Sequence, residues 1–212
     1  MAWGLVVPVK RLALAKTRLH VPAHPAGPDA GRRALALAFA CDVVTAGLGC
    51  PLVTTVLVVT DDPQASAALA ALGALVVPDL PDAGLNPALV HGADLLRAES
   101  PDLAVATVSS DLPAATARDL AAVLSAVEPG ERGFVPDAGG TGTTLLAAGP
   151  GAALLPTFGG ASRERHRASG ATELTSAACL RRDVDTADDL AAAVALGVGP
   201  HTTAALAALP FT

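Results

Sequence analysis

The sequence predicts an α/β fold in which helices pack against a parallel sheet. Short, unbroken apolar runs rich in β-branched residues recur along the chain, and alanine- and leucine-rich stretches of helical length separate them. Unbroken apolar runs are typical of strands that are buried on both faces of a parallel sheet. Strands that alternate with helices in this way indicate a doubly wound α/β layer.

Strands and helices alternate most clearly in the first part of the chain. The strands are expected at residues 3–9, 53–59, 75–77 and 103–108. The helices are expected at residues 32–46, 64–72, 87–99 and 117–127. Residues 60–63 (Thr-Asp-Asp-Pro) supply cap residues and a proline suited to the first turn of a helix.

The second part of the chain is richer in glycine and more broken. Strands are expected near residues 133–135 and 143–148, and helices at 162–168 and 188–196. Residues 200–212 are expected to form a tail, and residues 20–31 a Pro- and Gly-rich loop that is too short to link two domains. Because no repeat and no boundary is evident, we expect one domain over residues 1–212.

Composition excludes several classes of protein. The chain is 51% hydrophobic and 16% charged, which excludes a disordered protein. Only 2% of the residues are aromatic, which disfavours a module that stacks bases on aromatic side chains. The formal net charge of −6 argues against broad binding to nucleic acid.

The expected location is the cytoplasm. Cys41, Cys50 and Cys179 lack metal-ligand spacing and are expected to be buried thiols in a reducing compartment. The N-terminal apolar stretch precedes the first charges and contains Pro8, unlike a signal peptide. Pro and Gly interrupt every apolar run before it reaches a membrane-spanning length, so we expect no membrane association.

The basic residues gather in two segments. The first follows the first expected strand, has no acidic residue before Asp29, and contains Lys10, Arg11, Lys16 and Arg18. The second is residues 163–167 (Arg-Glu-Arg-His-Arg). In an open α/β sheet, ligands bind beyond the carboxyl ends of the strands, where fixed positive charge could hold a triphosphate. The first segment could equally be a solvated basic loop.

Asp111, in Ser-Asp-Leu-Pro, follows the expected strand at residues 103–108 and so lies at another carboxyl end. A carboxylate there could hold Mg²⁺, which takes oxygen ligands and usually shares them with phosphates. The alternative interpretation is an Asp turn or the N-cap of the helix that follows.

Asp183 and Asp185 alternate on an extended segment, so both carboxylates are expected to face one side. Two like charges that point together are destabilising unless a cation lies between them. Metal binding and simple solvation are both open for this pair. Thr186 is the expected N-cap of the next helix, with Asp188 and Asp189 in its first turn.

Two glycine-rich segments could present backbone N–H groups to an anion. Residues 137–146 (DAGGTGTTLL) lack the Gly-Lys-Ser/Thr ending of a phosphate-binding P-loop and could be an ordinary hairpin turn. Residues 158–166 (FGGASRERH) could bind phosphate or carboxylate, or could be a capped helix with solvated arginines. Asn86 could cap the helix expected from Pro87 or contact a base or ribose.

Taken together, eight short segments resemble the guanylyltransferases of deazaflavin coenzyme F-420 biosynthesis over nearly the full chain. In order they are PVKRLALAKTRL, TDD, GLNPAL, SDLP, DAGGTGTTLL, FGGASRERH, DVDTADDL and GVGPHT. The family includes 2-phospho-L-lactate guanylyltransferases and phosphoenolpyruvate guanylyltransferases. The alanine- and arginine-rich, lysine-poor composition is typical of high-GC actinobacterial coding and favours the phosphoenolpyruvate branch.

The resemblance implies a GT-A-like, nucleotide-diphospho-sugar transferase fold: a Rossmann-like three-layer sandwich with a mixed, mostly parallel sheet. It implies that the acceptor binds at Thr144, Gly159 and Ser162, with Arg163 nearby. It implies that Mg²⁺ is held by Asp111 and Asp185, with Asp183 as a third candidate, and that the nucleotide phosphates are approached by Lys10, Lys16 and Arg18. Ser109 and Ser110, where the family carries small apolar residues, depart from the pattern.

The function implied by the resemblance is the joining of GTP and phosphoenolpyruvate to give enolpyruvyl-diphospho-guanosine and pyrophosphate. The alternatives are 2-phospho-L-lactate as acceptor, another acceptor on the same fold, or a non-catalytic nucleotide-binding protein. The sequence leaves the oligomeric state and the number of metal ions open. The apolar residues 204–211 are a candidate homodimer contact.

Overall fold

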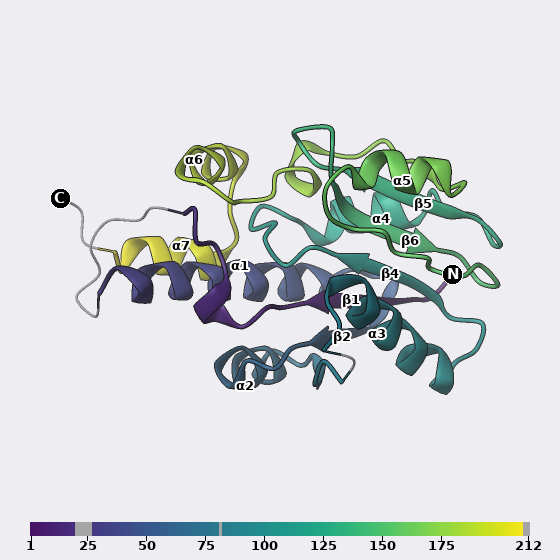
Figure 1. Ribbon diagram of the computed structural model, residues 1–212, viewed down its shortest axis with the longest axis horizontal. Helices are drawn as coiled ribbons and strands as arrows, with labels where there is room; N and C mark the ends of the chain where they lie inside the picture. Colours follow the sequence, from purple (N-terminus) through teal and green to yellow (C-terminus); the bar gives the residue numbers. More distant parts are fainter. Residues whose placement is uncertain (20–26, 81, 210–212) are drawn as a thin grey trace.

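The computed structural model describes residues 1–19, 27–80 and 82–209, and they form one seven-stranded sheet with helices on both faces (Figure 1). The strands are β1 (Trp3–Pro8), β2 (Val53–Val59), β3 (Leu75–Val77), β4 (Ala104–Val108), β5 (Arg132–Pro136), β6 (Thr143–Ala148) and β7 (Thr172–Glu173). Their order across the sheet is β3-β2-β1-β4-β6-β5-β7.

The sheet is mixed, and β6 is the strand that runs against its neighbours. β1 pairs in parallel with β2 and β4, β2 with β3, and β5 with β7. β6 pairs antiparallel with both β4 and β5. The β5–β6 pair is a hairpin, so the glycine-rich residues 137–142 form its turn. These pairings confirm the predicted mixed, mostly parallel sheet.

The helices are α1 (Pro28–Leu48), α2 (Pro63–Ala71), α3 (Leu85–Glu99), α4 (Ala117–Leu124), α5 (Ser162–Ala168), α6 (Ala187–Leu196) and α7 (Pro200–Ala207). Two short 3-10 helices lie at η1 (Leu12–Leu14) and η2 (Ala178–Leu180). Asp62 caps α2, and Thr186 forms a capping box with Asp189 at the start of α6, as the sequence predicts. Among the described helices, none is long and apolar enough to cross a membrane.

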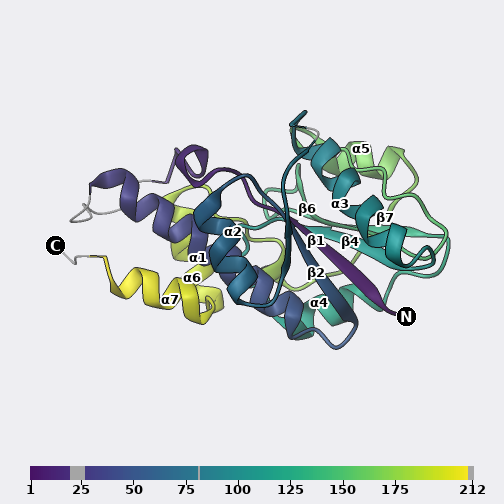
Figure 2. The ribbon, with the colours of Figure 1, turned by 90° about the horizontal axis from the view of Figure 1, so that it is seen from below.

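β1, β4 and the second half of β2 are buried on both faces, which explains their largely apolar sequences. Val7 and Val58 face a core formed with α1, α2 and α4. Val6 and Leu57 face the opposite core, which α3 covers. Because successive side chains of a strand point to opposite faces, β1, β2, β4 and β6 each contribute to both cores. The molecule therefore has three layers (Figures 1 and 2).

Two expectations for the loops and the tail were wrong. α1 begins at Pro28, inside the loop expected at residues 20–31, of which residues 20–26 lie outside the described residues. The expected tail forms α7, which packs beside α1 (Figure 1). The carboxylate of Asp42 in α1 accepts hydrogen bonds from the backbone N–H groups of His201 and Thr202, both at 2.9 Å. Residues 210–212 lie outside the described residues.

Candidate functional site

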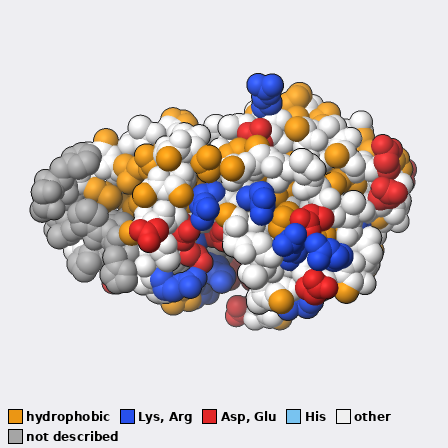
Figure 3. Space-filling model, turned by 90° about the horizontal axis from the view of Figure 1, so that it is seen from above, with side chains coloured by type: hydrophobic (Ala, Val, Ile, Leu, Met, Phe, Trp, Pro, Cys, Tyr) orange, Lys and Arg blue, Asp and Glu red, His pale blue; other side chains and the backbone are white. Residues whose placement is uncertain are grey.

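A cavity of about 630 Å³ lies at the carboxyl ends of β1 and β4. These two strands are parallel neighbours, so the segments that follow them leave the sheet at the same edge. The wall also includes parts of the β5–β6 hairpin, the loop before α5 (residues 157–160, the glycine loop) and the segment that precedes α6. Basic and acidic side chains gather around a hollow near the middle of this face (Figure 3). A smaller chamber of about 210 Å³ shares residues 8–10 of the wall.

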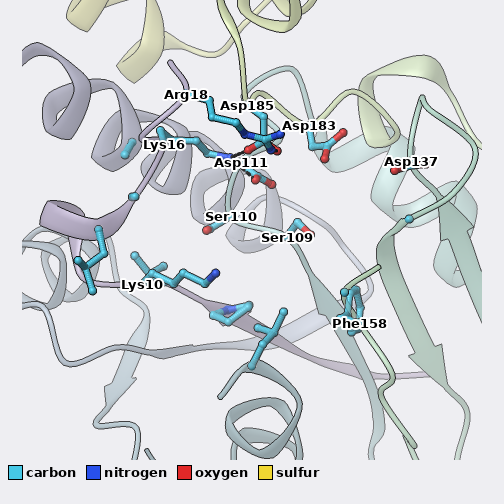
Figure 4. A pocket seen from close by; sticks show the side chains of 18 of the residues that line it. Lys10, Lys16, Arg18, Ser109, Ser110, Asp111, Asp137, Phe158, Asp183 and Asp185 are labelled. Atoms are coloured by element: carbon cyan, nitrogen blue, oxygen red, sulfur yellow. Dashed lines mark hydrogen bonds and ion pairs between the residues drawn. The ribbon is translucent and has the colours of Figure 1, made fainter. Parts of the chain in front are cut away.

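The aspartates predicted to share a metal ion converge in this cavity. The backbone N–H of Val184 donates to the carbonyl of Asp111 at 3.0 Å, which holds the two segments side by side. Val184 is fully buried against α1, and both flanking residues, Asp183 and Asp185, line the cavity with Asp111. The predicted alternation of this segment is therefore confirmed. Figure 4 shows the three carboxylates at one end of the cavity.

Lys16 reaches between two of these carboxylates. Its ammonium group contacts Asp111 and lies 2.8 Å from Asp185 Oδ1, and only 10% of the side chain is exposed. Arg18 donates to the second oxygen of Asp185 at 2.5 Å. The backbone of Lys16 is left-handed, with φ of 54°, a conformation that costs energy in residues other than glycine. The loop therefore delivers two cations to the aspartates.

These opposite charges shift one another's pKa values. Burial alone would lower the pKa of Lys16, but the Asp111 and Asp185 carboxylates hold it above its usual value. Burial alone would raise the pKa of Asp185, but Lys16 and Arg18 hold it below its usual value. Burial, together with the charge of Asp111, raises the pKa of Asp183 to about 6. Asp183 thus lies in a place where a further cation would be favourable.

Asp111 and Asp185 fit the requirements of a magnesium ion. Their carboxylates lie close enough for one ammonium group to contact both, and the buried Oδ1 of Asp111 has no hydrogen-bond partner among the described residues. Mg²⁺ is usually held by one or two carboxylates together with substrate phosphates and water. No group of three His, Cys, Asp or Glu side chains in the described residues could hold one ion, so a third ligand from Asp183 stays a prediction.

Lys10 is the second lysine of the cavity. It lines both the cavity and the smaller chamber, its side chain is exposed, and it forms no hydrogen bond or ion pair with another described residue. The loop that carries it is fixed by the backbone N–H of Leu12, which donates to the Asp62 carboxylate at 2.8 Å. Lys10 is therefore available to an anion that enters the cavity (Figure 4).

Thr144, which was predicted to bind the acceptor, does not line the cavity. The Thr144 hydroxyl is buried behind the wall and donates to the carbonyl of Leu180 at 2.6 Å. Its neighbour Thr143 lines the cavity, together with Gly159 and Ser162. Adjacent residues of a strand point to opposite faces, so only one of the two hydroxyls can face the ligand. Sequence reasoning missed Thr143.

Arg163 does not line the cavity, in contrast to its predicted place near the acceptor. Its guanidinium donates to both oxygens of Glu173, at 3.0 and 2.8 Å, and to the carbonyl of Gly140 at 2.9 Å. Arg165 donates to the carbonyl of Thr157 at 2.9 Å. These arginines hold the glycine loop and the hairpin turn in place.

Asn86 is neither the predicted cap nor part of the cavity wall. It lies inside α3, which begins at Leu85 after the cap residue Gly84. Its side-chain amide accepts from the backbone N–H of Phe158 at 2.8 Å and donates to the Phe158 carbonyl at 3.2 Å. Both ends of the amide are thus used to attach α3 to the glycine loop, and the predicted contact with a base or ribose is not supported.

The chain is similar to known proteins over nearly its whole length. No family model matches it. A phosphoenolpyruvate guanylyltransferase of Streptomyces coelicolor is 55% identical, with 99% of this chain and 98% of the relative covered. One of Thermomonospora curvata is 54% identical, with 99% of this chain and 91% of the relative covered.

Solved structures show the same fold at lower identity. A protein described as a nucleotide-diphospho-sugar transferase from Desulfovibrio desulfuricans has a TM-score of 0.67 at 18% identity, over 90% of this chain and 85% of that one. A nucleotidyl transferase from Methanothermobacter has a TM-score of 0.60 at 18% identity, over 92% of this chain and 97% of that one. The predicted nucleotide-diphospho-sugar transferase fold is therefore confirmed.

Proposed function

The chain belongs to the phosphoenolpyruvate guanylyltransferase family, and we propose that it joins GTP and phosphoenolpyruvate with release of pyrophosphate. The observation that carries the proposal is the contact of Lys16 with both Asp111 and Asp185. It brings together three segments that lie far apart in the sequence, at the edge of the sheet where α/β proteins bind nucleotides.

In the proposed reaction, a phosphate oxygen of phosphoenolpyruvate attacks the α-phosphorus of GTP. A new P–O bond forms, the bond between the α-phosphorus and its bridging oxygen breaks, and the electron pair leaves with pyrophosphate. The nucleophile is already anionic at neutral pH, so no strong general base is needed. The task of the protein is to bring two polyanions together and to align them.

The aspartate end of the cavity would hold the metal. Asp111 and Asp185 are the two carboxylates that we assign to Mg²⁺, with Asp183 as the third candidate. When bound, the ion supplies Lewis-acid stabilisation to the phosphate oxygens. Lys16 contacts the same two carboxylates and offsets part of their mutual repulsion.

The loop that follows β1 and carries Lys10, Lys16 and Arg18 (the cationic loop) would bind the triphosphate. Lys10 faces the cavity without a partner among the described residues, and Lys16 and Arg18 lie at its aspartate end. Positive charges fixed in these places would stabilise the negative charge that develops on the departing pyrophosphate. A substrate phosphate that attracts Lys16 would also free the aspartates for the metal.

The glycine loop and β6 would bind the acceptor. Thr143, Gly159 and Ser162 line one part of the wall, where their hydroxyl and backbone groups would bind a small phosphorylated acid. Thr144 would act only through its position in β6.

On this assignment the chain works as one nucleotidyltransferase domain in the cytoplasm, in the synthesis of coenzyme F-420. A homodimer through residues 204–211 stays a prediction, and residues 210–212 lie outside the described residues.

The proposal is tested by mass spectrometry of the products. The protein is incubated with Mg²⁺, each of the four nucleoside triphosphates and, in separate reactions, phosphoenolpyruvate and 2-phospho-L-lactate. We expect enolpyruvyl-diphospho-guanosine and one pyrophosphate per product from GTP and phosphoenolpyruvate. Product formed with 2-phospho-L-lactate but not with phosphoenolpyruvate would show that 2-phospho-L-lactate is the acceptor. Binding of GTP in calorimetry without any Mg²⁺-dependent product would contradict catalysis.

A further inference from the structure

His166 in α5 is fully buried behind the part of the cavity wall that Thr143, Gly159 and Ser162 form. Its ring lies between Phe134 and Phe158, with ring centroids 5.8 and 5.1 Å away. One ring nitrogen, Nε2, accepts the backbone N–H of Thr157 at 3.0 Å. The other, Nδ1, lies 2.9 Å from the hydroxyl oxygen of Thr143.

These contacts fix the position of the ring proton. A backbone N–H can only donate, so Nε2 must carry a lone pair, and a neutral ring then has its proton on Nδ1. Burial, with the nearby charges of Arg165 and Arg132, lowers the pKa of His166 to about 4, so the ring is neutral at physiological pH. Nδ1 therefore donates to the Thr143 hydroxyl.

The hydroxyl groups of Thr143 and Ser162 form a pair with one hydrogen to spare. They lie 3.2 Å apart, and both residues line the cavity. Each hydroxyl has one hydrogen, and their mutual hydrogen bond uses one of the two. Because Nδ1–H occupies a lone pair of Thr143, the remaining hydrogen cannot be directed at His166. It is left for a group in the cavity.

We propose that His166 is a positioning residue that turns a hydroxyl hydrogen of the Thr143–Ser162 pair toward an anionic oxygen of the acceptor acid. The inference rests on the proposed function, because it concerns how that site holds its acceptor. Without the Nδ1–H donor, the Thr143 hydrogen is free to rotate back toward position 166, and the cavity then faces a lone pair that repels the anion.

Two substitutions separate this role from simple packing. In His166→Asn the amide nitrogen lies near the place of Nδ1, so the donor to Thr143 is kept and the contact with Thr157 is lost. In His166→Gln the amide oxygen can reach the place of Nε2, so the contact with Thr157 is kept and the donor is lost. Both variants remove the ring from between Phe134 and Phe158.

The measurement is the KM for phosphoenolpyruvate in steady-state pyrophosphate release, with GTP saturating. We expect His166→Gln to raise this KM by about ten- to a hundredfold, the size of a hydrogen bond to a charged group, with the KM for GTP unchanged. We expect His166→Asn to stay within about threefold of the wild-type KM. The KM of the wild type is expected to show no inflection from the histidine between pH 6 and 8.

Equal KM increases in the two variants would overturn the inference, because packing alone would then explain them. Should neither variant fold, Thr143→Val and Thr143→Ser decide: valine must raise the KM for phosphoenolpyruvate, serine must restore it, and an unchanged KM in the valine variant overturns the inference. Wild-type protein that uses no phosphorylated acid would instead contradict the proposed function itself, and the inference would fall with it.

Discussion

Two basic segments of this chain look alike in sequence and differ in what they do in the fold. The cationic loop (Lys10, Lys16 and Arg18) faces the cavity, where its charges contact aspartates or lack a partner among the described residues. The arginine cluster (Arg163, Arg165 and Arg167) is directed at Glu173, Glu164 and backbone carbonyls of the glycine loop. The first segment is placed to meet a substrate, and the second holds the wall that the substrate meets.

The difference teaches that positive charge in a sequence is not the same as positive charge available to a ligand. Glu164 and Glu173 lie close to the arginine cluster along the chain, and the structure pairs them with it. The cationic loop has no acidic residue before Asp29, and the carboxylates that Lys16 contacts, those of Asp111 and Asp185, come from distant parts of the sequence. A carboxylate nearby in the sequence is the simplest sign that a basic residue already has a partner.

The largest expected effect on activity is that of a substitution at the aspartate end of the cavity. Asp111→Asn should lower the rate of pyrophosphate release by about a hundredfold or more, because positioned charge stabilisation is lost. Thermal unfolding should show that the variant is folded. Asp188→Asn, at an exposed residue in the first turn of α6, is the matched control and should keep the wild-type rate. Retention of more than about a tenth of the rate in Asp111→Asn would refute the metal assignment.

The next effect sharpens the contrast on the side of the cationic loop. Lys10→Met should lower kcat/KM for GTP by about ten- to a hundredfold, since a charge-assisted contact with phosphate is lost. The melting temperature should not change, because Lys10 is exposed and has no partner among the described residues. Lys10→Arg, which keeps the charge, should recover part of the activity. A wild-type kcat/KM in Lys10→Met would mean that the loop does not contact the nucleotide.

The smallest effect on activity is expected in the arginine cluster, where a substitution should lower the stability of the protein instead. Arg163→Met removes the bonds to Glu173 and Gly140 that join α5 to β7 and the hairpin turn. We expect the melting temperature to fall by a few degrees, as measured by differential scanning calorimetry, with the KM values at low temperature nearly unchanged. A large rise in the KM for phosphoenolpyruvate without any loss of stability would instead restore Arg163 as a substrate ligand.

The convergence of the aspartates could be predicted because it follows from local patterns. Asp111 comes directly after an apolar strand, and the alternation around Val184 places its two acidic neighbours on one side. Both arguments need only the geometry of strands and the rule that ligands bind at their carboxyl ends. The strands β1 and β4 were evident because both of their faces are buried and their sequences are largely apolar. The two-residue strand β7, which is partly exposed, was not predicted.

What could not be predicted depends on contacts between residues distant in sequence. The choice between Thr143 and Thr144 depends on which face of β6 meets the cavity, and both residues are threonine. α7 was expected to be a tail because Asp42, which binds its first turn, lies far away in α1. The role of Asn86 depends on its hydrogen bonds with Phe158 in the glycine loop, which is distant in sequence. None of these contacts leaves a periodic signal.

The most direct test of the central claim is a measurement of metal affinity with Mn²⁺ in place of Mg²⁺. Electron paramagnetic resonance gives the Mn²⁺ affinity of protein saturated with α,β-methylene GTP, which cannot react. Asp111→Asn and Asp185→Asn should each weaken Mn²⁺ binding at least about tenfold, and Asp188→Asn should leave it unchanged. Wild-type affinity in both Asp111→Asn and Asp185→Asn would contradict a divalent ion held between these two carboxylates.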